Sequence, residues 1–402
     1  MSDAPVLKRL LILRDDRLPF VDLDLTDPGT GEPLGEICLI GPNGCGKSTL
    51  LARLQEVVTG RPRWMESGDA YFLAKWRVEE EDLYFSRPFG GCEGIVFRSD
   101  IESSPEWSKF TGEPPAFEDL RTLFAANVIL DSTPGFGSAA SLWCDPDHCL
   151  VDGESPGDLT AFLELSLHER REAFHRFLRD PGNREKTVAA VEEIFEATSS
   201  HALRHLRQAW DRILAPSGLR VTIGGDEVGL VDRSDSPVPL ERLGSTLRQL
   251  LLLVGLAALR PDAHLFFDEA GAGLGPALAL DLAPLLRSLA ASPRERLFIA
   301  TNSPLVASQF APPSRIRFAL GNGGTLTLAR SSAPAEATLA TLLEMDFGVI
   351  ESATACQPDL PSAPTAVDSS RLKKAIRESD DEGELANLID EMMWIPKARE
   401  IP

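Results

Sequence analysis

The chain has 402 residues, 43% of them hydrophobic and 25% charged, and its formal net charge is −21. This length allows one large domain or two ordinary ones, and the composition is typical of a globular protein. No apolar run reaches the roughly 18 residues of a membrane-spanning helix, and Lys8 and Arg9 interrupt the N-terminal apolar stretch, so we expect neither a membrane segment nor a signal peptide. The negative charge disfavours a broad, nonspecific nucleic-acid surface.

The six cysteines are scattered along the chain, which is typical of a reducing cytosol rather than of a disulfide scaffold. We therefore expect a cytoplasmic protein. Only the stretch WCDPDHC, with Cys144, His148 and Cys149, suggests a metal site. Its spacing fits no common zinc pattern and no second ligand pair follows it, so we interpret it as a polar surface loop.

The first part of the chain predicts strands that lead into a helix. Apolar patterning predicts strands at 7–13, 20–25 and 36–40. The helix is expected from Lys47 to about Val58. Residues 62–150 are less regular. Strand-like fragments occur there at 71–77, 95–98 and 127–130.

The rest of the chain alternates between helical and extended patterns. Residues 157–214 have helical periodicity, interrupted at 181–183 and near Ser199. Further on, we predict hairpins at 219–232 and 315–329, helices at 245–259 and 276–290, and strands at 264–267 and 296–300. Residues 353–370, rich in Pro, Ser and Ala, favour a linker, and 371–393 predict a charged amphipathic helix.

The stretch from Gly41 to Ser48 matches the phosphate-loop pattern GxxxxGK[ST] in full, between an apolar strand and a helix. Glycines let backbone N–H groups surround phosphates, and a helix N-terminus favours their negative charge. Lys47 would reach the β- and γ-phosphates, and the Ser48 hydroxyl would bind Mg²⁺. The predicted nucleotide-binding residues here are Gly41, Asn43, Gly44, Cys45, Gly46, Lys47, Ser48 and Thr49.

A second motif supplies carboxylates. The apolar residues 265–267 are followed directly by Asp268 and Glu269. Acids at the end of a strand are common, but a phosphate loop upstream favours a functional interpretation. Asp268 would hold Mg²⁺, and Glu269 would polarise the attacking water as a general base.

Together these motifs resemble those of the ABC-type ATPases, in the soluble branch that contains RecF and the heads of the structural-maintenance-of-chromosomes (SMC) proteins. IGPNGCGKSTLL, RLGSTLRQLLLLVGLAAL, HLFFDEA and LFIATNSPLV follow one another in the order of that family. The resemblance covers roughly 7–50 and 240–350. It implies an α/β fold, in which a mixed sheet surrounds the phosphate helix and a helical insertion, or lid, and a C-terminal helical tail are added.

The resemblance also implies a division of the chain. Residues 1–150 and 216–350 would be the two parts of the ATPase domain. Residues 151–215 would be the helical insertion, and 351–402 the linker and tail.

In the family, a signature segment contacts the nucleotide bound by a partner subunit. Its counterparts here are Gly244, Ser245 and Thr246, so the resemblance implies a head-to-tail homodimer or a higher oligomer. The chain departs from the family at three places: the signature lacks its usual Ser and Gly positions, residues 270–275 are glycine-rich and uncharged, and Asn302 replaces a histidine. Asn302 can donate a hydrogen bond but cannot carry a proton. The glutamine of the family's Q-loop is not assigned. We therefore expect ATP hydrolysis that is slow or conditional.

The resemblance further suggests the ATPase subunits of prokaryotic anti-phage systems, in which the ATPase controls a separate effector, often a nuclease. A RecF-like DNA-repair ATPase and a nucleotide-gated scaffold with little hydrolysis are the alternatives, and a transporter subunit is disfavoured. Nucleic-acid binding has weak support, because acidic and basic residues nearly balance within 166–212. The basic residues to test there are Arg170, Arg171, Arg204 and Arg207.

Overall fold

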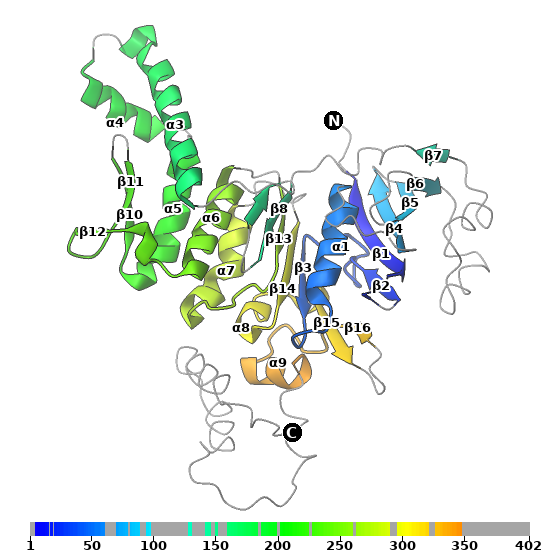
Figure 1. The fold of residues 1–402 in the computed structure, drawn as a ribbon. Coiled ribbons are helices and arrows are strands. Elements are labelled where there is room, and N and C mark those ends of the chain that lie inside the picture. Colours follow the sequence, from blue (N-terminus) through cyan, green and yellow to red (C-terminus); the bar gives the residue numbers. More distant parts are fainter. Residues whose placement is uncertain are drawn as a thin grey trace, which may run out of the picture.

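The computed structural model describes residues 5–15, 17–18, 20–60, 70–78, 81–88, 94–97, 128–130, 141–145, 149–151, 159–183, 186–198, 202–224, 227–259, 263–289, 296–320 and 326–347. At its centre lies a mixed sheet of seven strands (Figure 1). These are β3 (Glu36–Ile40), β8 (Ser141–Cys144), β9 (Cys149–Val151), β13 (His264–Phe267), β14 (Leu297–Thr301), β15 (Arg315–Leu320) and β16 (Leu326–Arg330). The expected α/β class with a mixed sheet is confirmed.

The order of the central sheet places the two motifs near each other. It runs β16-β15-β3-β14-β13-β8-β9. The strands from β15 to β8 are parallel, whereas β9 and β16 are antiparallel additions at the edges. The carboxyl ends of β3 and β13 therefore point to the same edge of the sheet, with only β14 between them. Ligands commonly bind at this edge of parallel sheets.

A second sheet is antiparallel and has the order β2-β1-β4-β5-β6-β7. Its strands are β1 (Val6–Arg14), β2 (Val21–Asp24), β4 (Tyr71–Val78), β5 (Glu81–Pro88), β6 (Gly94–Phe97) and β7 (Val128–Leu130). Helix α1 (Lys47–Thr59) lies between the two sheets. Leu50 and Leu54 of α1 share one buried core with Leu10 and Phe72 of the second sheet and Phe298 of the central sheet.

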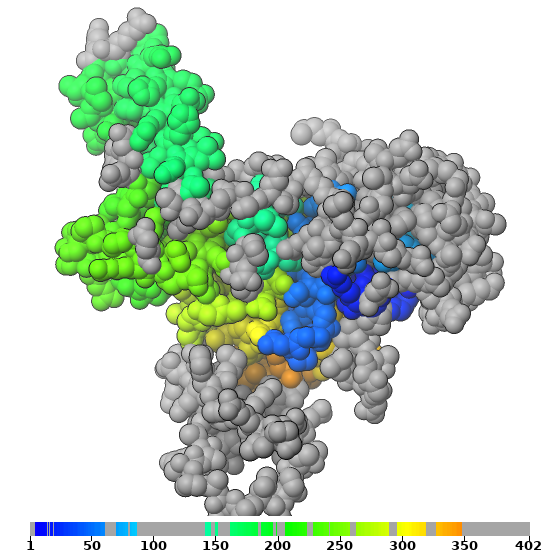
Figure 2. Space-filling view, viewed as in Figure 1, coloured from blue at the N-terminus to red at the C-terminus, as the bar shows by residue number. Residues whose placement is uncertain are grey.

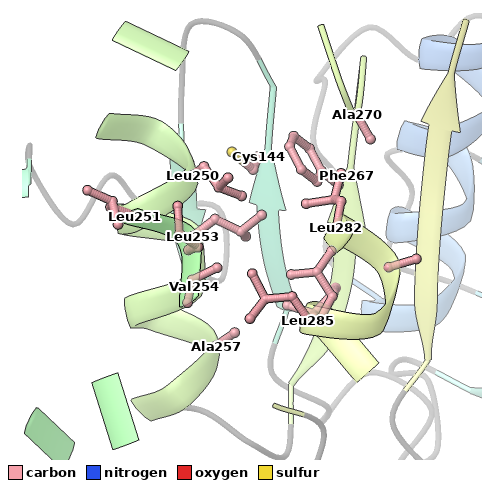
Figure 3. Close-up of a cluster of buried hydrophobic side chains, with 14 of the residues drawn as sticks. Cys144, Leu250, Leu251, Leu253, Val254, Ala257, Phe267, Ala270, Leu282 and Leu285 are labelled. Carbon is pink, nitrogen blue, oxygen red and sulfur yellow. The ribbon is translucent and has the colours of Figure 1, made fainter. Parts of the chain in front are cut away.

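The opposite face of the central sheet is covered by α6 (Ser245–Leu259) and α7 (Pro276–Leu289). Leu250 and Val254 of α6 and Leu282 and Leu285 of α7 pack around Phe267 of β13 (Figure 3). The sequence of α6 is apolar on almost every side, as expected for a helix covered by neighbours on more than one face. It lies between α7 and the helical insertion.

The insertion consists of α3 (Leu159–Leu178), α4 (Val188–Thr198) and α5 (Ala202–Leu214), and its far end, with α3 and α4, projects from the body (Figures 1 and 2). It is attached through α5, where the Trp210 indole N–H donates to the Leu251 carbonyl at 2.9 Å. A Cβ on Gly255 of α6 would lie 2.7 Å from Cε1 of Phe162, so only glycine allows this approach. A small sheet packs beside the helices of the insertion. Its strands are β10 (Arg220–Gly224), β11 (Glu227–Val231) and β12 (Pro237–Val238).

Among the described residues, the remaining helices are short. They are α8 (Pro304–Ala307), α9 (Leu339–Met345) and the 3-10 turns η2 (Pro181–Asn183), η3 (Ala215–Ser217), η4 (Leu240–Arg242) and η5 (Pro312–Ser314). Within the described ranges, no helix has the length and apolar character needed to cross a bilayer.

Two expectations are wrong. WCDPDHC is not a surface loop at its ends, because Cys144 and Cys149 are buried in paired strands. In the part of the chain that the structure describes, no three His, Cys, Asp or Glu side chains come together as metal ligands around this pair, and His148 lies outside that part. Arg170 is not a surface cation, because it is 5% exposed and pairs with Glu192 at 3.0 Å.

Other expectations are not tested. The four-part division of the chain stays a prediction. The expected tail, 351–402, lies outside the described residues.

Candidate nucleotide-binding site

The phosphate loop connects β3 to α1 and depends on its glycines. Gly41, Gly44 and Gly46 have φ angles of 154°, 77° and 98°, in a region that side chains disfavour. A Cβ on Gly41 would also lie 2.8 Å from Cβ of Phe318. Gly46 is the N-cap of α1 and supplies no side-chain hydrogen bond, so the first backbone N–H groups of α1 are left for an anion.

Lys47 is held against the loop. Its ammonium group donates to the carbonyl oxygens of Gly41 and Pro42, both at 2.8 Å, and it is 8% exposed. Cys45 is buried beneath the loop, with its sulfur 3.8 Å from the Lys47 nitrogen. The positive charge is therefore already placed beside the phosphate-binding N–H groups.

Asp268 lies at the carboxyl end of β13 and is 7% exposed. Burial raises the pKa of its carboxyl group above the ordinary value, while hydrogen bonds from the Ser48 hydroxyl and the Glu269 N–H oppose that rise. A buried carboxylate that contacts a hydroxyl is a suitable ligand pair for a hard cation. Magnesium therefore fits the oxygen atoms of Ser48 and Asp268.

A carboxylate that the sequence analysis missed lies beside Asp268. In the parallel pair of β8 and β13, Phe266 is opposite Trp143 and Phe267 is opposite Cys144, so the next pair in register is Asp268 and Asp145. The negative charge of Asp145 contributes to the raised pKa of Asp268. The Trp143 indole N–H donates to Asp145 at 2.8 Å, which keeps this carboxylate on the face that α1 covers.

A signal for Asp145 was present in the sequence. The run SLWC followed by Asp145 repeats, on a neighbouring strand, the pattern of an apolar strand ended by an acid that identified Asp268. The interpretation of WCDPDHC as a surface loop concealed this strand end.

A cleft of about 260 Å³ lies over the loop. Its lining residues are Arg17, Asn43, Gly44, Gly46, Lys47, Ser48, Thr49, Glu269 and Asn302. Most of the predicted site residues therefore meet in one place. Glu269 is exposed to this cleft and has a φ of 50°, which is unusual for a residue with a side chain. The Asn302 amide donates to the Asn43 side chain at 3.0 Å, across the cleft from strand β14 to the loop.

Arg17 is a cleft residue that no sequence pattern indicated. It follows β1, and its backbone N–H donates to Asp15 at 2.8 Å. Asp15 in turn accepts a 2.7 Å bond from Arg53 of α1, and both side chains of this ion pair are almost fully buried. A buried ion pair on the phosphate helix thus fixes the segment that carries Arg17.

The predicted signature residues do not reach this cleft within one chain. Gly244 and Ser245 are exposed at the start of α6, and Thr246 lies against the glycine-rich turn after Glu269. A Cβ on Gly273 of that turn would lie 2.8 Å from the Thr246 hydroxyl. Two segments in which the chain departs from the family thus form one continuous surface beside the cleft. Their role toward a partner's nucleotide stays a prediction.

Comparisons with known proteins give structural neighbours only. No protein-family model matches the chain, and no curated protein matches it. Among solved structures, it is similar to the SMC head domain from Thermotoga maritima, with 13% identity, a TM-score of 0.42, and coverage of 82% of this chain and 100% of that one.

Two further similar structures are also SMC heads. One is bound to the C-winged helix domain of ScpA, with 14% identity, a TM-score of 0.45, and coverage of 81% of this chain and 98% of that one. The other has an extended coiled coil and is bound to the C-terminal domain of ScpA, derived from Pyrococcus furiosus, with 12% identity, a TM-score of 0.42, and coverage of 81% and 96%. At these values, the similarity assigns no activity, partner or residue role to this chain.

Proposed function

We propose that the chain binds ATP together with Mg²⁺ and hydrolyses it. The observation that carries this proposal is the meeting of Lys47, Ser48 and Glu269 in one cleft, with Asp268 bonded to Ser48 behind it. A phosphate loop alone would explain binding of an anion. A general base on the far side of the same cleft is the additional part that hydrolysis needs.

Each residue then has a defined task. The N–H groups at the start of α1 and the Lys47 ammonium bind and orient the phosphates, and Arg17 adds a second positive charge at the mouth of the cleft. Glu269 accepts the proton of the attacking water, while Asn302 orients the terminal phosphate. When bound, Mg²⁺ would neutralise the negative charge that develops on the phosphate oxygens.

The metal would be held by Ser48 and Asp268, with Asp145 as a further carboxylate beside them. Two neighbouring carboxylates repel each other, and a divalent cation removes that repulsion. This arrangement supports a metal-dependent site and gives Asp145 a place in it.

We further infer that two chains combine head to tail with ATP between them. Exposed Gly244 and Ser245 form one surface with the glycine-rich turn, and neither can act on the cleft of its own chain. A second copy would place this surface over the nucleotide. In this arrangement, each site is completed by its partner.

The biological role rests on the family resemblance. We propose a sensor subunit whose ATP-dependent dimer controls a separate effector, such as a nuclease, in prokaryotic phage defence. A RecF-like role in DNA repair is the alternative, and it predicts ATP-dependent DNA binding that salt weakens strongly. Arg170 cannot serve to test that alternative, because its side chain is buried in an ion pair.

A nucleotide-gated scaffold is a second candidate, and Asn302 favours it, because this residue cannot carry a proton and is bonded to Asn43. Turnover of ATP separates the two. For an ATPase, Glu269→Gln should lower turnover by about 100-fold or more. Exposed Glu336→Gln should leave it unchanged. Equal, background-level turnover in the wild type and in Glu269→Gln would identify the scaffold.

The dimer is tested with the same variant. Glu269→Gln should elute as a dimer with MgATP and as a monomer without nucleotide, because ATP is retained. Adding Ser245→Arg should abolish the dimer while leaving nucleotide binding intact. A monomeric Glu269→Gln chain that binds MgATP would exclude the head-to-tail arrangement.

A further inference from the structure

Cys144 and Cys149 form a close thiol pair. They face each other directly in the antiparallel register of β8 and β9, and their sulfur atoms are 3.0 Å apart. Directly opposed residues of antiparallel strands have Cα atoms about 4.5–5.5 Å apart, which lies within the range that a disulfide spans. All four described cysteines, Cys38, Cys45, Cys144 and Cys149, are free thiols, so the pair is reduced in this structure. The strand register thus brings Cys144 and Cys149 within the Cα separation that a disulfide spans, although their sulfur atoms still have about 1 Å to close.

This pair is joined to the proposed metal site by the backbone. The carbonyl of Cys144 accepts the N–H of Asp268 at 2.7 Å, and Asp145 is the next residue in the chain. The Cys144 side chain points to the opposite face of the sheet, toward Leu250 of α6 (Figure 3). A change at the sulfur atoms therefore acts on the strand end that carries the carboxylates without contacting the nucleotide.

Access to the pair is narrow. Cys144 and Cys149 are 1% and 6% exposed. Cys144 lines a cavity of about 30 Å³ together with Asp268, Glu269 and Thr246. A single water needs roughly 10–15 Å³ by this kind of measure, so the cavity suits a molecule with two oxygen atoms. Hydrogen peroxide fits, whereas a peptide disulfide such as oxidised glutathione does not.

We propose that Cys144 and Cys149 are a peroxide-sensitive dithiol whose disulfide weakens metal-dependent nucleotide binding. One cysteine reacts as its thiolate: its sulfur attacks a peroxide oxygen, the O–O bond breaks, and the hydroxide that leaves takes up the thiol proton to become water, so that a sulfenic acid is formed. The second sulfur then attacks the first, the S–O bond breaks, and a second water leaves. Two thiols lose two electrons in total, and one peroxide gains them.

The effect on binding follows from the geometry and rests on the proposed function. The sulfur atoms must approach from 3.0 Å to about 2.05 Å. Burial against α6 restricts side-chain adjustment, so β8 and β9 must move, and the carbonyl of Cys144 and the carboxylate of Asp145 move with them. We expect the affinity for MgATP to fall by about fivefold or more, the lower end of the usual coupling between two sites.

Mass spectrometry and nucleotide binding test the two parts separately. The folded, full-length protein is treated with hydrogen peroxide or with oxidised glutathione, alkylated and digested. The peptide that contains both cysteines should lose about 2 Da and resist alkylation after peroxide only, and dithiothreitol should restore it. A variant with serine at Cys92 and Cys356, which lie outside the described residues, is the matched control and should behave in the same way.

The outcomes are distinct. Cys144→Ser and Cys149→Ser should each prevent the 2 Da loss and keep MgATP affinity constant under peroxide. No disulfide in the wild type, or oxidation of these two thiols to separate acids, overturns the proposal. A disulfide that leaves MgATP affinity unchanged also overturns it. If the reduced protein binds no ATP, the proposed function fails, while the mass measurement still decides whether the dithiol exists.

Discussion

The N–H of Asp268 donates to the carbonyl of Cys144 at 2.7 Å, which fixes the end of β13 against the end of β8. Asp268 and Asp145 therefore lie side by side at the ends of the two strands, and their negative charges repel each other. This relationship and the cleft over the phosphate loop lead to three predictions, and buried His264 leads to a fourth.

Asp145→Asn should weaken metal binding. If Asp145 helps to hold Mg²⁺, the Mg²⁺ concentration for half-maximal ATP binding should rise by about tenfold, the usual effect of losing one supporting ligand. Binding of ATP without metal should not weaken, because a repulsive charge has been removed. The binding of a fluorescent ATP analogue, measured without metal and at increasing Mg²⁺ concentrations, gives both the metal-free affinity and the Mg²⁺ requirement. Asp180→Asn, at an exposed position outside the cleft, is the control. A lower Mg²⁺ requirement in Asp145→Asn would show that Asp145 only repels.

Ser48→Ala should separate metal-dependent from metal-independent binding. The variant removes the hydroxyl that contacts Asp268 but keeps the loop N–H groups and Lys47. Calorimetry should show a fall of about tenfold in affinity for MgATP, and little change for ATP in EDTA. The exposed residue Ser288, changed to Ala, gives the matched control. Equal losses with and without Mg²⁺ would contradict a metal role for Ser48.

Arg17→Ala should lower affinity for ATP by about tenfold, because it removes a charge-assisted contact to phosphate at an exposed position. Arg17→Lys should recover part of the loss. Asp15→Asn should have a similar effect without touching the cleft, because Asp15 accepts the Arg17 backbone N–H and is itself held in place by Arg53. Calorimetric titration with ATP measures all three variants. Arg9→Ala, which removes a side chain that does not line the cleft, should bind ATP normally. Wild-type affinity in Arg17→Ala would remove Arg17 from the site.

The stability of the protein should fall between pH 6.5 and pH 4 because of His264. Burial, with the neighbouring charge of Arg296, lowers the pKa of His264 from 6.5 to about 4. The unfolded chain therefore takes up a proton at a higher pH than the folded chain, and the stability present above pH 6.5 is lost as the pH falls. The loss is at most about 3 kcal/mol.

Urea unfolding across this pH range measures the effect. His264→Asn should flatten the pH dependence, since its side chain can accept the 3.1 Å bond from the Arg296 N–H without titrating. His168→Gln, at an exposed position, should keep the wild-type slope. The same slope in His264→Asn would show that other groups are responsible.

The sequence predicts those parts of the fold that depend on local patterns. The phosphate loop, β13 and α6 follow from glycine spacing and from apolar runs with clear ends, and the predicted range of α6, 245–259, agrees with the structure. β8 and β9 were missed because the stretch WCDPDHC, which contains the end of β8 and the start of β9, was interpreted as a surface loop. Their pairing with each other and with β13 defines them as strands, and local pattern does not contain that information.

The candidate site divides in the same way. Lys47, Ser48 and Asp268 belong to short motifs that can be identified from neighbouring residues in the sequence alone. Arg17 and Asp145 depend on which loops the sheet order brings together, and local spacing does not contain that information. Cys144 and Cys149 show the same limit, since they form one pair only after two strands have been aligned.

The Trp210–Leu251 hydrogen bond and the contact between Phe162 and Gly255 fasten the insertion to the middle of α6. A helix of 15 residues is a rod about 22 Å long, and this one begins at Ser245, on the surface proposed to close over a partner's nucleotide. Helix α6 therefore connects the insertion directly to that surface. In the proposed dimer, a partner that binds the projecting helices and rotates α6 would therefore also move the surface that faces the second chain, and would change the ATP site without contacting it.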